Sequence, residues 1–209
     1  MYSPKFNQVT DRGILIEAMQ ANSFAILFGP VNRTGDAPDA AATHLPLVVK
    51  DEGGHGLIQG HFARANRHWQ ALAGRETLVV FAGPHSYVSP TLYVEELSVP
   101  TWNYIAIHAC GTLELVEDDA GKEALLKDLI AIHEPAYLDR WSAMPGGYRR
   151  TMLAGIVGFR IPIARIEGKF KLSQNRKAEE RKNVHGAQAA GSADEQALAR
   201  WMERLGVSS

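Results

Sequence analysis

The stretch from Pro100 to Val116 constrains the fold most, because it reads as one long extended segment with a single bend. In a strand, its residues alternate between two faces. One face carries Thr101, Asn103, Ile105 and Ile107, and the other carries Trp102, Tyr104, Ala106 and His108. Gly111 permits a bulge before the strand resumes. A long bent strand of this kind is typical of small β-barrels, and its aromatic face suits either a planar ligand or the packing of a barrel interior.

Further short apolar segments predict additional strands, because Gly, Pro or polar residues bound each of them. These strands cover residues 23–28, 43–50, 57–60, 77–83 and 153–166. Apolar spacing and capping residues predict helices over 11–21, 61–74, 118–132 and 192–205, with Ser173 as a cap for one more. Residues 31–42 are predicted as a loop, and residues 84–93 as an ordered loop or irregular strand. This pattern predicts a mainly β fold, a small barrel with added helices.

The length of 209 residues suits one domain of moderate size with a C-terminal appendage. We expect residues 1–170 to form the barrel with its inserted helices. Residues 171–209 would form a helical segment. The last helix carries an apolar stripe of Leu198, Trp201, Met202 and Leu205. That stripe needs a partner, so the segment is expected to pack on the barrel or on a second subunit.

A cationic stretch from Gly60 to Trp69 is the first candidate for binding chemistry. Read as a helix, it places His61, Arg64 and His68 on one face. A helix start with free N–H groups, an arginine and two histidines can hold a phosphate. A solvated amphipathic helix without a ligand explains the same pattern.

The strand over 43–50 contains Pro46, which lacks the N–H group that a neighbouring strand would bond. This position must therefore lie at an edge, a bulge or a gap in the pairing. A gap would let a ligand approach the backbone beside Thr43 and His44, whereas a plain edge strand needs no ligand.

Composition and motifs exclude several classes of protein. The formal net charge is −1, so nucleic-acid binding would need a local basic patch. The single cysteine, Cys110, allows no internal disulfide, which suits a cytoplasmic protein. The sequence has no glycine-rich nucleotide motif, no GxSxG, no metal-like histidine spacing and no apolar run that could span a membrane. Any redox chemistry would therefore come from a cofactor.

Residues 165–185 form the basic part of the chain, with seven Lys or Arg against three Glu and a formal charge of +4. Such a run can contact DNA, but it is also typical of the solvated face of a helix. Both interpretations stay open at this point.

Several motifs, in order along the chain, together carry a family resemblance. They include His44-Leu45-Pro46, Gly60-His61 with Ala63-Arg64-Ala65-Asn66, Gly83-Pro84 with Tyr87-Val88-Ser89-Pro90, Val99 to Tyr104 with His108 and Gly111, His133-Glu134, and Lys171 to Arg176. Because of these motifs, the chain resembles the PaiB-type family of FMN-binding negative transcriptional regulators. The matches extend over nearly the whole chain.

The resemblance implies a split β-barrel like that of pyridoxamine 5′-phosphate oxidases. It also implies a homodimer with FMN in clefts at the subunit interface. The implied phosphate ligands are Thr43, His44, His61, Arg64 and Asn66. The residues implied to line the flavin ring or close the site from the partner subunit are Thr101, Trp102, Asn103, Lys171, Ser173 and Gln174.

Two positions depart from the pattern of the family. Arg67 stands where proline is usual, and Leu92 stands where tryptophan is usual. Arg67 adds charge for a phosphate or is simply solvated. Leu92 either weakens flavin stacking or only changes the packing.

Three functions compete on this evidence. The first is a negative transcriptional regulator that binds FMN and contacts DNA directly or indirectly. The second is an FMN-dependent oxidoreductase on the same barrel, because one fold supports both uses. The third is a barrel that binds another planar ligand, such as heme through His108 or His61, or that has lost its cofactor.

Overall fold

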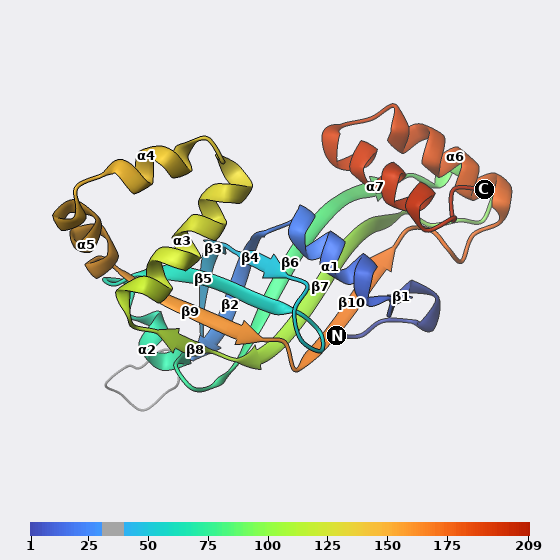
Figure 1. The fold of residues 1–209 in the computed structure, drawn as a ribbon. Helices are drawn as coiled ribbons and strands as arrows, with labels where there is room; N and C mark the ends of the chain where they lie inside the picture. The colour runs from blue at the N-terminus through green and yellow to red at the C-terminus, as the bar shows by residue number, and fades with distance from the viewer. Residues whose placement is uncertain (31–39) are drawn as a thin grey trace. The chain divides into compact units, whose positions relative to one another are not determined.

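The strands of this computed structural model form a six-stranded sheet and a four-stranded sheet in the described part of the chain, residues 1–30 and 40–209 (Figure 1). The larger sheet has the strand order β1-β10-β7-β6-β2-β3, and the smaller has the order β4-β5-β9-β8. The strands are β1 Gln8–Val9, β2 Phe24–Pro30, β3 Ala40–Pro46, β4 Val48–Lys50, β5 Leu57–Ala63, β6 Glu76–Val88, β7 Thr101–Thr112, β8 Glu114–Val116, β9 Ile156–Pro162 and β10 Arg165–Lys171.

The helices of the described residues lie mostly in the second half of the chain. They are α1 Arg12–Ala21, α2 His68–Leu72, α3 Asp119–His133, α4 Tyr137–Ala143, α5 Gly146–Ala154, α6 Ala178–Ala189 and α7 Ala193–Arg204, with short 3-10 turns η1 Lys5–Asn7 and η2 Pro90–Leu92. None of these helices has the length and hydropathy needed to cross a membrane.

The elements fall into two units, and helix α1 and strands β6, β7 and β10 contribute to both. The first unit comprises Met1–Leu15, Ala82–Ile107 and Glu167–Ser209. The second comprises Ile16–Phe81 and His108–Ile166. The predicted division at residue 170 stays a prediction.

In the first unit, α6 and α7 lie against each other near the C-terminus (Figure 1). Helix α7 begins at the predicted capping box, in which Ser192 and Glu195 bond each other's backbone N–H groups. Leu198, Trp201 and Met202 of its apolar stripe are buried, and the Trp201 and Phe170 rings pack edge to face with centroids 5.3 Å apart. The stripe therefore finds a partner within its own unit.

In the second unit, β5 pairs with β9 in antiparallel register, with Phe62 opposite Val157. Phe62 is fully buried against Phe159 at a centroid distance of 5.0 Å. Helices α3, α4 and α5 gather on one side of this unit (Figure 1). Helix α3 lies so close to β9 that a Cβ at Gly158 would stand 2.8 Å from Leu125.

Most predicted elements are confirmed, but the predicted helix over 61–74 is wrong. The chain continues as strand β5 to Ala63, because pairing with β9 and burial of Phe62 favour the extended backbone. Only His68–Leu72 is helical, so His61, Arg64 and His68 do not share a helix face.

Other differences concern the ends of elements. Strand β6 runs unbroken to Val88, so the first part of the region predicted as an ordered loop or irregular strand is a strand. Residues 40–42 of the predicted loop belong to β3, and residues 31–39 lie outside the described residues. Ser173 does not cap a helix, because α6 begins after Lys177.

Candidate functional site

A polar cluster lies where β3 meets the turn between β5 and α2 in the second unit. We call Thr43, Arg64, Asn66, Arg67 and His68 the turn cluster. Thr43 Oγ1 lies 2.8 Å from His68 Nδ1, and Asn66 Nδ2 donates to Thr43 Oγ1 at 3.4 Å. The His68 N–H donates to Asn66 Oδ1 at 3.1 Å. These bonds fix the turn against the strand.

His68 is the buried member of the turn cluster, with 4% of its surface exposed. Its ring meets the edge of Phe62 at a centroid distance of 6.4 Å. Burial lowers the pKa of His68, against a smaller opposing effect of the Gly29 backbone. The imidazole is therefore held neutral, and it acts as a polar support for Thr43.

Arg64 is exposed and holds the turn between α5 and β9. Its Nε donates to the Ala154 carbonyl at 2.7 Å, and its Nη2 donates to the Ile156 carbonyl at 3.0 Å. The Arg64 N–H also bonds the Gly155 carbonyl. Basic side chains commonly satisfy the last carbonyls of a helix in this way. Arg64 thus holds a fixed positive charge beside the α5–β9 turn.

His44 and His61 do not converge on the turn cluster, contrary to the arrangement expected for phosphate ligands. His44 neighbours Thr43 on β3, so its side chain points to the opposite face, where it stacks with Phe24 at 6.1 Å. His61 likewise points away from buried Phe62, and burial lowers its pKa. It shares its strand face with Gln59, which bonds Asp128 of α3. His61 therefore faces the α3 side of β5.

A second polar site lies within the first unit, between the start of β7 and the end of β10. This β7–β10 pocket has a volume of about 120 Å³. Its lining residues are Tyr93, Val99, Pro100, Thr101, Asn103, Lys171, Ser173, Asn175 and Arg176. Four of the predicted site residues, Thr101, Asn103, Lys171 and Ser173, are therefore brought together.

Side chains of the β7–β10 pocket are oriented by bonds to one another. Lys171 Nζ donates to Thr101 Oγ1 and, at 2.7 Å, to the Trp102 carbonyl. Ser173 Oγ donates to Asn103 Oδ1 at 3.0 Å. Asn103 is fully buried, and its Nδ2 has no hydrogen-bond partner among the described residues. Burial, followed by the charges of Lys169 and Arg176, lowers the pKa of Lys171.

Two predicted residues stay outside the β7–β10 pocket. Trp102 lies on the other face of β7, half exposed, beside Tyr87 and His85 at centroid distances of 6.2 and 6.1 Å. Gln174 folds back onto the end of β10, where it accepts from the Leu172 N–H at 2.7 Å and donates to the Phe170 carbonyl. Gln174 therefore holds the loop that carries Ser173.

Both sites can bind an anion, because each combines positive charge with hydroxyl and amide groups. Sequence reasoning missed His68 as the support of Thr43 and missed Arg176 as a pocket cation. Arg176 lies over the ring of Tyr93, 3.8 Å from its centroid. The sequence feature that could have identified Arg176 is its place at the end of the Lys171–Arg176 motif. Among the described residues, no group of three or more His, Cys, Asp or Glu side chains could hold a metal ion.

The chain is similar in sequence to known proteins. A family model described as "Putative FMN-binding domain" matches residues 1–165. The chain is 36% identical over 190 residues to the protease synthase and sporulation protein PAI 2 of Bacillus subtilis, covering 88% of this chain and 87% of that protein. It is 28% identical to the uncharacterized protein AN0679 of Emericella nidulans, covering 83% and 84%.

Solved structures share the fold at low sequence identity. The flavocytochrome Anf3 of Azotobacter vinelandii matches with a TM-score of 0.54 and 16% identity, over 80% of this chain and 74% of that one. The conserved hypothetical protein Rv2991 of Mycobacterium tuberculosis matches with a TM-score of 0.56 and 13% identity, over 82% and 91%. These matches agree with the predicted split-barrel fold. FMN is the cofactor that the family match supports. The chain therefore belongs to the PaiB-type family of FMN-binding proteins.

Proposed function

We propose that the turn cluster holds the FMN phosphate. The residues fit this group, because Arg64 and Arg67 are exposed cations within one turn and Thr43 and Asn66 add hydrogen-bonding groups beside them. A phosphate is bound most strongly by such charge-assisted bonds. Bound FMN would supply one- or two-electron redox chemistry, while the chain itself supplies binding and orientation.

The proposed functional form is a homodimer, and an exposed apolar face of β2 supports it. Phe24 and Phe28 point outward from β2, with 66% and 38% of their surfaces exposed. Ile26 lies between them and pairs with Val80 of β6 on one side and His44 of β3 on the other. Contiguous exposed apolar surface of this kind marks a protein interface. A second copy of the chain would cover this face.

The chain's role is proposed to be that of an FMN-binding negative transcriptional regulator in the cytoplasm. The observation that carries this proposal is the similarity to PAI 2 over most of both chains. Chromatin immunoprecipitation with the full chain should enrich discrete promoter regions. Transcripts from those regions should rise in a deletion strain. Absence of both effects would remove the regulatory role.

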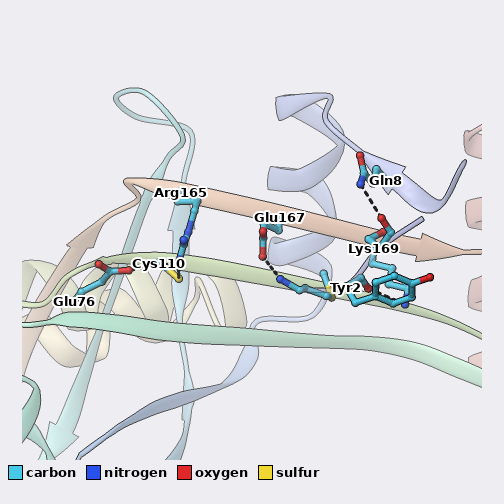
Figure 2. A network of polar contacts seen from close by, with 9 residues as sticks. Tyr2, Gln8, Glu76, Cys110, Arg165, Glu167 and Lys169 are labelled. Carbon is cyan, nitrogen blue, oxygen red and sulfur yellow. Dashed lines mark hydrogen bonds and ion pairs between the residues drawn. The ribbon is translucent and has the colours of Figure 1, made fainter. Parts of the chain in front are cut away.

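Several of the seven cations in the basic segment 165–185 contact other residues of the chain. Figure 2 shows that Arg165 lies beside Cys110 and Glu76, and that Lys169 lies beside Tyr2. Lys177 pairs with Glu95 at 2.7 Å. The proposed regulator would therefore reach DNA through other surfaces or through a partner protein. Promoter binding by the purified chain alone that weakens steeply with salt would indicate contact through another surface, because direct phosphate contacts make binding strongly salt-dependent. Absence of promoter binding by the purified chain would indicate a partner protein.

An FMN-dependent oxidoreductase is the second candidate function. The fold match to flavocytochrome Anf3 favours it. The test is turnover of the FMN-loaded protein with reduced nicotinamide and an electron acceptor. Steady turnover well above that of free FMN would favour the enzyme, and turnover equal to that of free FMN would exclude this reductase activity.

A further inference from the structure

The β7–β10 pocket has a hydrogen-bond donor that no bond within the described residues satisfies. Asn103 has none of its surface exposed, and Ser173 occupies its Oδ1, so the Nδ2 donors are left without a partner among the described residues. A buried donor without an acceptor is unfavourable, which favours a ligand that brings an acceptor. Asn103 is one of the residues that line the pocket.

The backbone beneath the pocket is held in an unfavourable conformation. Ser173 has a φ of +64°, the left-handed region that side chains other than glycine rarely adopt, and it is 4% exposed. Such strain is typical of sites where a side chain must point in one direction. Here it directs the Ser173 hydroxyl to Asn103 at the pocket wall.

Positive charge dominates the lining of the pocket. Lys171 and Arg176 both contribute to it, and its lining residues include no carboxylate. The nearest acidic groups have other partners, because Glu95 pairs with Lys177 and Glu180 accepts the Val94 N–H at 3.1 Å. Arg176 is oriented by the Tyr93 ring. The pocket is therefore organised to receive negative charge.

The size of the pocket suits a small anionic head group. A volume of about 120 Å³ matches roughly four water molecules. Two cations, three hydroxyls and two amide side chains line the pocket. Together they outnumber the acceptors of one carboxylate and suit the several oxygens of a phosphate.

We infer that the β7–β10 pocket binds the phosphate head of a small ligand other than FMN. The ligand would be a substrate or an effector of the flavoprotein. This inference rests on the proposed function in one respect: it assumes that the turn cluster, and not this pocket, holds the FMN phosphate.

The test is calorimetric titration of the FMN-saturated full chain with inorganic phosphate in a phosphate-free buffer. We expect saturable binding of one phosphate per chain. Lys171→Met and Arg176→Met should each weaken it by about tenfold or more, the usual effect of losing a charged hydrogen bond. Lys182→Met and Arg200→Met are matched controls on exposed cations and should leave it unchanged.

FMN binding by the same variant separates the two possible sources of the phosphate. If Lys171→Met weakens FMN binding to the apoprotein as much as it weakens phosphate binding, the pocket holds the phosphate of FMN and the inference is wrong. Absence of saturable phosphate binding to the FMN-loaded wild type also overturns it, even where a variant fails to fold. Phosphate binding without any FMN uptake would instead contradict the proposed function and leave the pocket assignment intact.

Discussion

Arg64 combines a structural contact with an exposed positive charge, so its two roles need separate measurements. We predict that Arg64→Ala weakens FMN binding by about 1.5–3 kcal/mol, because a charged hydrogen bond to the phosphate is lost. Fluorescence titration with FMN measures this change, and urea unfolding measures any loss of the contact with the α5–β9 turn. Arg75→Ala, on another exposed arginine of the same unit, should leave FMN affinity unchanged. Equal effects of the two substitutions would remove Arg64 from the phosphate site.

Two histidines with lowered pKa values predict a pH dependence of stability. Burial lowers the pKa of both His61 and His68 below the usual 6.5. Below that pH the unfolded chain binds protons that the folded chain does not, so the free energy of unfolding falls as the pH decreases toward the folded pKa. Urea unfolding at pH 7.5 and 5.5 should show this loss. His68→Asn, which cannot titrate, should lose less between the two pH values, and an identical loss would exclude His68 as a cause.

Strain at Ser173 predicts an unusual order of stabilities. Both Ser173→Ala and Ser173→Gly lose the hydrogen bond to Asn103, but only glycine adopts a φ of +64° without steric cost. The glycine variant should therefore be more stable than the alanine variant by about 1 kcal/mol. Urea unfolding of the two proteins gives the difference. An alanine variant as stable as the glycine variant would show that the backbone is not strained.

Sequence reasoning identified candidate binding residues, but it predicted only some of the contacts among them correctly. Thr43 and Asn66 were predicted together and lie together, because the turn after β5 returns to β3. His44 and His61 were predicted with them and do not join them, because in a strand neighbouring residues point to opposite faces. Asn103 and Ser173 do meet, because a hydrogen bond joins these two residues although they lie 70 positions apart in the sequence. Long-range pairing of this kind leaves no local signal in a single sequence.

At the scale of elements, β5 shows where local pattern and tertiary structure disagree. The 3–4 spacing of residues 61–69 favours an amphipathic helix, and α2 forms only part of it. Residues 57–63, which precede α2, stay extended because each of them pairs with a residue of β9, and this pairing satisfies their backbone hydrogen-bonding groups. In contrast, α7 follows its sequence closely, since its capping box and apolar stripe act locally.

The exposed apolar face of β2 predicts a dimer that one substitution disrupts. Phe24→Lys should convert the dimer to a folded monomer, because a lysine on this face cannot be buried without an ionic partner. Sedimentation velocity measures the mass, and circular dichroism confirms the fold. Tyr148→Lys is the control, because that aromatic residue is similarly exposed on α5. A wild-type protein that is monomeric at high concentration would contradict the proposal.

At the scale of the whole molecule, family membership and fold agree while the regulatory role rests on similarity. Residues spread over nearly the whole sequence carried the family resemblance, which the family match over 1–165 confirms. The mainly β fold with added helices is also confirmed. The two sequence departures, Arg67 and Leu92, fall in a turn of the second unit and in η2 of the first. Neither replaces a predicted phosphate ligand.

The most direct test of the account is a titration of the purified protein with FMN and, in parallel, with riboflavin. Flavin fluorescence should report saturable uptake of one FMN per chain. Riboflavin lacks the phosphate and should bind about tenfold more weakly or worse, because it cannot use the charged groups of the turn cluster. Failure to take up FMN, or riboflavin binding as tight as that of FMN, would contradict the proposed phosphate site.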